Sequence, residues 1–208
     1  LFAQINLIVS PANFKQIEDF LIEKKIEKVK LFLQDSPTGM KDAIQIGLQH
    51  DVTKYVLIIW GDQVCVNRTT LLNCIYHAYQ GSDHNLILPT VLKQSPYISF
   101  IRNDKNRIEQ VLESRELNLN HENQLGETDC GVFLFNTSSL KNVIFNPDNE
   151  RLATGKATGE QNLLPLIPLF DNGVGTLLTV RTTCLEESIG INSLQDVSSA
   201  EKFITSLE

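Results

Sequence analysis

The first 92 residues alternate short apolar runs with amphipathic segments, and this alternation restricts the possible folds more than any other feature. Four apolar runs have the length and composition of buried strands, at 5–10, 28–34, 54–60 and 85–92. Three segments between them place apolar residues at helical spacing, at 11–26, 38–49 and 69–80, and Thr69 can cap the last one. The alternation predicts right-handed βαβ units and a parallel sheet.

The second half of the chain lacks this regular alternation. Two strand-like runs flank Asn103-Asp104-Lys105-Asn106, a pattern that predicts a hairpin. We expect strands at 131–136 and 175–183, a helix at 159–173 shortened or kinked by its two prolines, and a closing helix at 194–207. These elements predict a single α/β domain over 1–208, with a mixed, mostly parallel sheet flanked by helices.

The composition argues against nucleic-acid and membrane partners. The 208 residues include 25 acidic and 18 basic side chains, a formal net charge of −7, whereas surfaces that bind nucleic acids or anionic lipids are basic. No run approaches the roughly 18 apolar residues of a membrane-spanning helix, and no signal peptide is visible. The four cysteines are scattered without a C-x-x-C pair, which favours a reduced, cytoplasmic setting.

The apolar run YVLIIW ends abruptly at Gly61-Asp62. Ligands of open α/β sheets bind beyond the carboxyl ends of the strands, where Asp62 could hold a divalent cation such as Mg²⁺. Gly61 would let the backbone turn sharply and leave room for a ligand. Asp62 could instead cap the following loop. A phosphorylated receiver aspartate is a third reading, which the mixed second half disfavours.

Six short motifs follow one another along the chain. They are QDSPTGMKDAI (34–44), WGDQV (60–64), RIEQVLESRE (107–116), ETDCGVFLF (127–135), TGEQNLLPLI (158–167) and SIGIN (188–192). Each motif alone is a weak signal. In this order and approximate spacing, together with the helix-like segment after SIGIN, they resemble the sugar-phosphate nucleotidyltransferases. N-acetylglucosamine-1-phosphate uridylyltransferase domains are the members to which the chain is most readily compared.

One motif of the family is missing from this sequence. The family carries a glycine-rich loop, Gly-x-Gly-x-Arg followed by a lysine, whose N–H groups cradle the triphosphate. GKATGE (155–160) has glycines but neither the preceding strand nor the spacing. Leu1 falls near the start of the family's second strand, so we expect the first strand and loop to lie outside 1–208, and this chain alone to be inactive or nearly so. Asp129 and Pro165 also depart from the asparagine and aspartate of the family.

The resemblance implies a reaction and a set of site residues. A nucleoside triphosphate and a sugar 1-phosphate would give a nucleotide sugar and pyrophosphate, with Mg²⁺ as cofactor. The implied catalytic and metal-binding residues are Asp62 and Asn192. The implied nucleotide-binding residues are Gln34, Thr38, Gly39 and Gly61, and the implied substrate-binding residues are Glu113, Asp129, Gly131 and Glu160. Simpler roles stay open, because Thr38 and Asn192 could cap helices and Glu113 could be an exposed strand residue.

Other functions compete with this interpretation. A non-catalytic nucleotide-sugar-binding or regulatory domain of the same fold is favoured if the complete protein has no glycine-rich loop. A sugar-transferring enzyme of the related nucleotide-sugar-binding fold usually shows Asp-x-Asp, whereas Gly61-Asp62-Gln63-Val64 has one acid. A thiol nucleophile at Cys65 lacks a recognisable base.

Overall fold

The computed structural model describes residues 4–49, 53–80, 84–113, 124–156, 158–171 and 176–206. The chain divides into two compact units, each formed by two stretches of sequence. Unit 1 comprises 1–52 and 141–166, and unit 2 comprises 53–140 and 167–208. The chain passes from one unit to the other between residues 52 and 53, within α5 (Thr137–Ile144) and within η2 (Leu164–Phe170). The expectation of a single domain stays a prediction.

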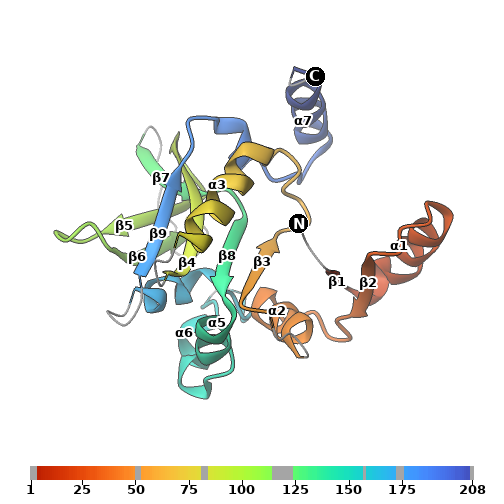
Figure 1. Ribbon diagram of the computed structural model, residues 1–208, viewed down its shortest axis with the longest axis horizontal. Helices are drawn as coiled ribbons and strands as arrows, with labels where there is room; N and C mark the ends of the chain where they lie inside the picture. The colour runs from red at the N-terminus through yellow and green to blue at the C-terminus, as the bar shows by residue number, and fades with distance from the viewer. Residues whose placement is uncertain are drawn as a thin grey trace. The chain divides into compact units, whose positions relative to one another are not determined.

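Unit 1 begins with a parallel βαβ unit, as the sequence predicts (Figure 1). β1 (Ile5–Val9) pairs with β2 (Val29–Leu33), and α1 (Pro11–Glu23) connects the two strands. Pro11 opens α1, where its fixed φ and missing N–H suit the first turn of a helix. α2 (Met40–Leu48) follows β2. Later in the sequence, unit 1 receives η1 (Pro147–Asn149) and α6 (Glu150–Ala153).

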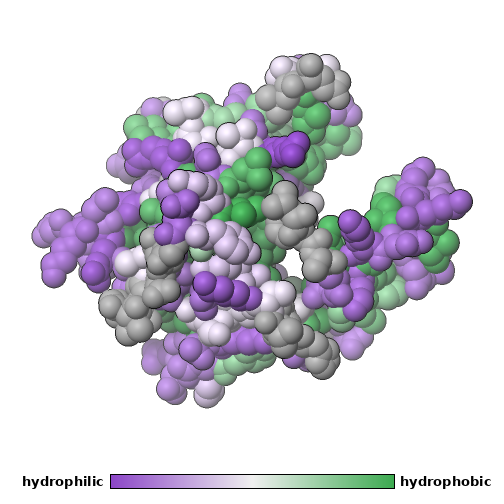
Figure 2. Space-filling model, viewed as in Figure 1, coloured by the Kyte–Doolittle hydropathy of each residue, from purple (hydrophilic) through white to green (hydrophobic). Residues whose placement is uncertain are grey.

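α1 contributes little to the core of unit 1. None of its residues is buried, and its Phe20 and Ile22 are 52% and 69% exposed. Figure 2 shows both hydrophobic and hydrophilic side chains on the surface of this helix. The buried hydrophobic side chains of unit 1 come instead from the end of β1, from α2 and from residues 144–166, and include Ile44, Leu48 and Ala153.

Unit 2 is built around β4 (His84–Gln94), a strand of 11 residues. β9 (Thr176–Arg181) pairs in parallel with one edge of β4. The other edge pairs antiparallel with β8 (Val132–Asn136) and then with β7 (Leu125–Asp129). β8 pairs in turn with β3 (Tyr55–Ile59), again antiparallel. The sequence did not predict β7, because LGETD has no run of apolar residues.

The α/β class is confirmed, but the described strand pairs are not mostly parallel. β1–β2 and β4–β9 are parallel, whereas β3–β8, β4–β8, β4–β7 and β5–β6 are antiparallel. β3 and β4 run parallel to each other, as βαβ alternation predicts, since both are antiparallel to β8. β8 nevertheless lies between them. Apolar runs identify strands but not their neighbours, so the sequence did not reveal this insertion.

The hairpin expected around 103–106 is confirmed. β5 (Ile98–Arg102) and β6 (Ile108–Glu113) pair antiparallel, and Asn106 takes the left-handed conformation at φ 61° that asparagine tolerates. The motif at 107–116 continues beyond β6 into residues that lie outside the described part of the chain.

Two helix boundaries differ from the expectations. α3 (Arg68–Tyr79) is capped by Asn67, whose side chain accepts a hydrogen bond from the N–H of Thr69, so Thr69 is not the cap. In place of the helix expected at 159–173, the short 3₁₀ helix η2 covers 164–170, because its prolines have no N–H to donate. Residues 172, 173 and 175, at the ends of expected elements, lie outside the described residues.

The core of unit 2 lies on both faces of its sheet. On one face, Cys74 and Ala78 of α3 pack on Ile87 and Leu134, where α3 lies against β4 and β8 (Figure 1). The opposite face carries a chain of aromatic contacts formed by Trp60, Phe133, Phe135 and Phe170. Unit 2 ends with η3 (Leu185–Ser188) and α7 (Leu194–Ser206). None of the helices in the described ranges is long and apolar enough to cross a membrane.

β1 and β3 each have an edge with no described partner strand. In β3, two backbone hydrogen bonds fix which residues face β8: the N–H of Trp60 donates to the Gly131 carbonyl, and the N–H of Thr137 donates to the Lys54 carbonyl. By the alternation of an antiparallel ladder, the backbone groups of Tyr55, Leu57 and Ile59 point away from it. In β1, the backbone groups of Asn6 and Ile8 likewise point away from β2. Apolar edges of this kind can accept further strands.

Candidate functional site

Asp62 lies just beyond β3, beside a turn that is distant in sequence. The N–H of Ile191 donates to the backbone carbonyl of Asp62 at 3.0 Å. Gly190 comes so close that a Cβ added to it would lie 2.5 Å from Asp62 Oδ2. The structure therefore brings the SIGIN segment onto the strand-end carboxylate. Whether the Asp62 and Asn192 side chains reach one ion stays a prediction.

Asn192 is not the cap of the closing helix. Ser193 immediately precedes α7, and its hydroxyl accepts the N–H of Asp196 at 3.2 Å. The Asp196 carboxylate in turn accepts the N–H of Asn192 at 3.0 Å and the Ser193 hydroxyl at 2.8 Å. The Asn192 side chain is exposed, and among the described residues its amide donates only to the carbonyl of Gly190, at 3.3 Å. Ser193 and Asp196 thus satisfy the helix start and leave the Asn192 oxygen to another role.

Asp129 and Gly131 form a tight turn beneath Asp62 and Gln63. Asp129 Oδ1 accepts the N–H of Gly131 at 2.7 Å, and Gly131 has φ +66°. A Cβ on Gly131 would lie 2.2 Å from Cγ of Gln63, so only glycine fits there. Gln63 was not predicted as a site residue, and its Oε1 is buried without a hydrogen-bond partner among the described residues.

The charges of Asp62 and Asp129 interact at this end of unit 2, and neither carboxylate forms an ion pair with a residue that the structure describes. Desolvation raises the pKa of Asp129, and the charge of Asp62 raises it further, while the hydrogen bond from the Gly131 N–H opposes the shift. The Asp62 carboxylate accepts no hydrogen bond and forms no ion pair within the described residues. A cation beside Asp62 would relieve this repulsion.

The oxygen atoms present fit Mg²⁺ better than a metal that needs several strong protein ligands. No group of three or more histidine, cysteine, aspartate or glutamate side chains in the described ranges could hold a metal. Mg²⁺ commonly takes one or two protein oxygens and completes its shell with phosphate and water. Asp62, together with the amide oxygen of Asn192, the residue after Ile191, is a donor set of that kind.

Gly61 shows one of its two expected properties. A Cβ added to it would meet nothing within 4 Å, so the space in front of it is open. Its φ is outside the left-handed range, so the backbone there does not require glycine.

Sequence reasoning missed a hydrogen-bond network around Glu127, which lies in the same motif as Asp129 and Gly131. Glu113 ends β6 opposite Ile98, and its role toward a sugar stays a prediction. Glu127, the first residue of ETDCG, is instead held by Arg102 through contacts of 2.7 and 2.9 Å, and by the Thr90 hydroxyl at 2.8 Å. Burial alone would raise the pKa of Glu127, but these bonds outweigh it and lower the pKa. The acid of this motif therefore stabilises the sheet.

In unit 1, the residues predicted to contact the nucleotide form one cluster around the start of α2. Gln34 is buried, and its amide donates to the Gly39 carbonyl at 3.0 Å and to Asp42 at 2.8 Å. Both amide hydrogens of Gln34 are therefore used inside the protein, and only its oxygen remains for a nucleotide base. Gly39 itself is the N-cap of α2, so Thr38 does not cap that helix.

Gly39 and Thr38 lie directly against the segment that carries Glu160. Gly39 has φ +129°, and a Cβ there would lie 2.4 Å from the carbonyl oxygen of Gln161. The N–H of Gln161 donates to Thr38 at 2.8 Å. Exposed Glu160, predicted to bind the sugar, is therefore next to the predicted nucleotide residues. Sequence reasoning missed Lys41, Glu150 and Gln161, which support this contact.

The cysteines do not provide a nucleophile. Burial is the main reason that the pKa of each of the four thiols is raised. The pKa of Cys74 is raised to about 12. The thiol of Cys65, the one nearest Asp62 in sequence, therefore stays protonated near neutral pH.

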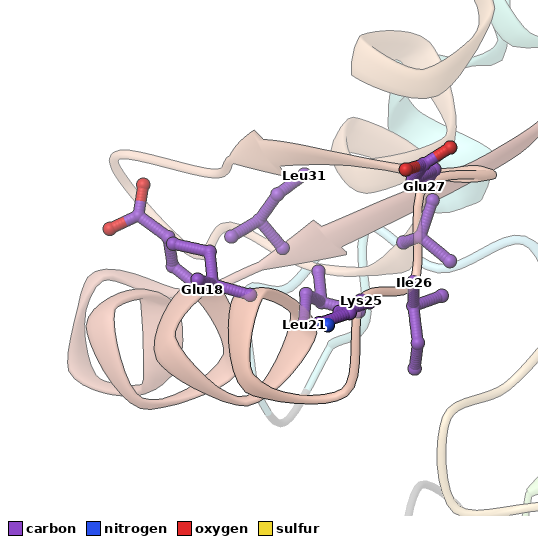
Figure 3. A pocket seen from close by; sticks show the side chains of 8 residues that line it. Glu18, Leu21, Lys25, Ile26, Glu27 and Leu31 are labelled. Atoms are coloured by element: carbon purple, nitrogen blue, oxygen red, sulfur yellow. The ribbon is translucent and has the colours of Figure 1, made fainter.

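A hollow of about 360 Å³ lies between α1 and β2 and is separate from these clusters (Figure 3). Its apolar wall includes Leu21, Ile26 and Leu31, with Glu18 and Lys25 among the remaining side chains. It contains none of the predicted site residues, so we do not assign the proposed chemistry to it.

Comparison with known proteins was made on sequence and on structure. No family model matches the chain. The bifunctional protein GlmU of Staphylococcus epidermidis is 26% identical over 172 residues, which cover 81% of this chain and 37% of that protein. GlmU of Latilactobacillus sakei is 25% identical over 187 residues, covering 85% and 39%. The chain therefore spans less than two-fifths of the length of these relatives.

Solved structures show the same fold. HddC from Yersinia pseudotuberculosis has a TM-score of 0.62 at 18% identity, covering 97% of this chain and 79% of that one. A 4-diphosphocytidyl-2C-methyl-D-erythritol synthase from Anaerococcus prevotii has a TM-score of 0.63 at 13% identity, covering 98% and 82%. With the sequence relatives, these likenesses confirm the resemblance to the sugar-phosphate nucleotidyltransferases as a distant homology over most of the chain.

Proposed function

We propose that this chain, as a distant homologue of the sugar-phosphate nucleotidyltransferases, forms the metal- and substrate-binding part of an Mg²⁺-dependent enzyme of that kind. The enzyme would transfer a nucleotidyl group from a nucleoside triphosphate to a sugar 1-phosphate. The observation that supports this most is the Asp62 carboxylate. It follows an apolar strand, lies against Gly190, and accepts no hydrogen bond from the described residues. Such a carboxylate is available to a cation.

The chemistry needs positioning and charge neutralisation more than acid–base groups. An oxygen of the sugar 1-phosphate attacks the α-phosphorus of the triphosphate and forms a new P–O bond. The bond to the bridging oxygen breaks, and pyrophosphate leaves with its electron pair. The attacking oxygen is already an anion, so no side chain has to remove a proton.

The predicted site residues of each unit would have the following roles. In unit 2, Asp62 and Asn192 would hold Mg²⁺, which when bound supplies Lewis-acid stabilisation of phosphate charge and orients the reacting groups. Asp129, Gly131 and Glu113 would face the sugar. In unit 1, Gln34, Thr38 and Gly39 would lie along the nucleotide base, and Glu160 would accept a hydrogen bond from a sugar hydroxyl. Gly61 would leave space for the phosphates, where a side chain at 61 could intrude.

The non-catalytic alternative rests on one sequence observation. A transferase must also neutralise the β- and γ-phosphates, and these 208 residues contain no Gly-x-Gly-x-Arg segment. A regulatory domain of the same fold would bind a nucleotide sugar without releasing pyrophosphate. The two functions therefore predict different outcomes in one assay.

The test is a screen of nucleoside triphosphates against sugar 1-phosphates with the complete gene product and Mg²⁺, detecting pyrophosphate. We expect release only when both substrates are present, at an ordinary enzymatic rate of about 1 to 1000 per second. Asp62→Asn should lower that rate at least about 100-fold. Asp104→Asn, in the exposed hairpin turn, is the control and should leave it unchanged. Nucleotide-sugar binding without pyrophosphate release in any pair would select the regulatory alternative.

A further inference from the structure

Lys41 is a buried cation at a position that ordinarily disfavours one. Its side chain is 1% exposed, and it occupies the first turn of α2, the positive end of the helix dipole. Its Nζ donates to Glu150 Oε1 at 3.1 Å and to Gln161 Oε1 at 3.2 Å. The Gln161 amide donates to the other Glu150 oxygen at 2.8 Å. The three side chains therefore form a closed triangle of hydrogen bonds.

The backbone beside this triangle joins the same two segments. The N–H of Lys41 donates to the Gln161 carbonyl at 2.9 Å, and the N–H of Gln161 donates to the Thr38 carbonyl at 2.8 Å. The missing side chain of Gly39 lets the two backbones meet this closely. On its other side, the Gln161 segment is bridged to Thr154, next to α6. The contact thus links the start of α2, the end of α6 and residue 160.

We infer that Lys41 is a positioning residue that fixes Thr38 and Gly39 relative to Glu160. The predicted nucleotide-binding and sugar-binding residues of unit 1 would then keep one relative arrangement. The claim about ligands rests on the proposed function. The claim that Lys41 couples the two segments does not, because it concerns only the contacts just described.

Stability alone is a weak reason for this arrangement. Replacing a buried ion pair with an apolar side chain of similar size is often neutral or stabilising. The side chain of Glu150 is 55% exposed and can return to water when its partner is lost. Lys41→Met should therefore leave the global fold intact and release mainly the contact between the two segments.

The test begins with amide hydrogen exchange on the full chain carrying Lys41→Met. We expect the amides of Lys41 and Gln161 to exchange at least tenfold faster, while the β4–β9 amides of unit 2 do not change. Glu150→Gln should act in the same direction with a smaller effect. The double variant should be no worse than Lys41→Met alone if Lys41 acts through Glu150. Lys15→Met, which removes an exposed lysine from its pairs with Glu18 and Asp19, is the matched control.

The second measurement is steady-state kinetics of the complete gene product. A positioning role predicts that Lys41→Met raises KM about tenfold for both the triphosphate and the sugar 1-phosphate, with kcat largely kept. Faster exchange with unchanged KM values would show that Lys41 is only structural and overturn the inference. Unchanged exchange at Gln161 would overturn it whatever the kinetics. If the wild-type protein releases no pyrophosphate, the proposed function fails, and the exchange result alone decides whether Lys41 couples the segments.

Discussion

Lys41 of unit 1 and Glu187 of unit 2 are both buried charged side chains near residues of the candidate site, and the two charges are neutralised differently. Lys41 of unit 1 pairs with the carboxylate of Glu150, which reaches the surface. Glu187 of unit 2 is 2% exposed and has no basic partner within salt-bridge distance among the residues that the structure describes. It lies three positions before Gly190, in the segment that approaches Asp62.

Neutral donors surround Glu187. Its Oε1 accepts the hydroxyls of Thr70 at 3.0 Å and Thr182 at 2.8 Å, and its Oε2 accepts the N–H of Asn67 at 3.1 Å. These donors come from the start of α3 and from the turn after β9. Loss of Glu187 would leave them without an acceptor, whereas loss of Lys41 leaves a carboxylate that water can reach. We therefore expect the contacts of Glu187 in unit 2 to be rigid, and the contacts of Lys41 in unit 1 to tolerate substitution better.

The largest effect should come from Glu187→Ala. It removes three hydrogen bonds to a charged acceptor and opens a cavity, which together should lower the free energy of unfolding by about 4 kcal/mol. Lys41→Met should change it by less than about 1 kcal/mol. Urea unfolding of both variants measures the difference. Equal losses of unfolding free energy in Lys41→Met and Glu187→Ala would contradict this difference between the units.

Gly39→Ala should come next, because it disrupts the backbone contact in unit 1 and leaves every charge in place. A Cβ at φ +129° is strained and would lie 2.4 Å from Gln161 O, so we expect a loss of about 3 kcal/mol. Gly61→Ala is the matched control, since a Cβ there meets open space. Equal unfolding free energies for the two variants would mean that the close approach of Gly39 to Gln161 is not needed.

Arg102→Met tests a third way to neutralise a buried charge, since Glu127 has both a cation and a hydroxyl donor. The lowered pKa of Glu127 means that its ionised form stabilises the wild type above the unfolded pKa of about 4.3, and that this stabilisation is lost as pH falls through the folded pKa. Without Arg102, burial favours the protonated form. The variant should therefore lose about 2 kcal/mol at pH 7 and less near pH 4.

Urea unfolding at the two pH values, with Arg107→Met as control, measures that change. Arg107 contacts Asp171 at 3.7 Å and is about half exposed, so its loss should be small at both pH values. A destabilisation by Arg102→Met that is equal or larger near pH 4 would contradict the role given to Glu127.

The smallest effect on stability should come from Asp62→Ala. No hydrogen bond or ion pair of its carboxylate is lost within the described residues, and removing one of two neighbouring carboxylates relieves repulsion. We expect a change within about 0.5 kcal/mol. A loss above about 2 kcal/mol in urea unfolding would mean that Asp62 serves the fold rather than a ligand.

The sequence predicted the local elements better than their neighbours. The apolar runs of β1, β2, β3 and β4 and the hairpin were visible because spacing and turn residues are local signals. The insertion of β8 between β3 and β4 depends on long-range pairing, which no local pattern reports.

The same difference between local and long-range signals applies to the residues of the candidate site. Asp62 was identifiable from the abrupt end of an apolar run, and Asn192 and Glu160 came from the family resemblance. Lys41 and Glu187 were missed, since a lysine in an amphipathic helix and a glutamate in a turn are usually exposed. Burial that arises from partners far away in the sequence gives no sequence signal.

The proposed function requires that Asp62 and Asn192, 130 positions apart, bind one divalent cation during nucleotidyl transfer. The most direct measurement is a crystal structure of the complete gene product with Mn²⁺ and a nucleotide sugar, with the metal located by anomalous scattering. We expect one ion about 2.1 Å from an oxygen of each side chain, bridged to the phosphates of the ligand. A metal bound elsewhere, or Asp62 and Asn192 oxygens more than about 12 Å apart, far beyond the span of two ligands on one ion, would contradict it.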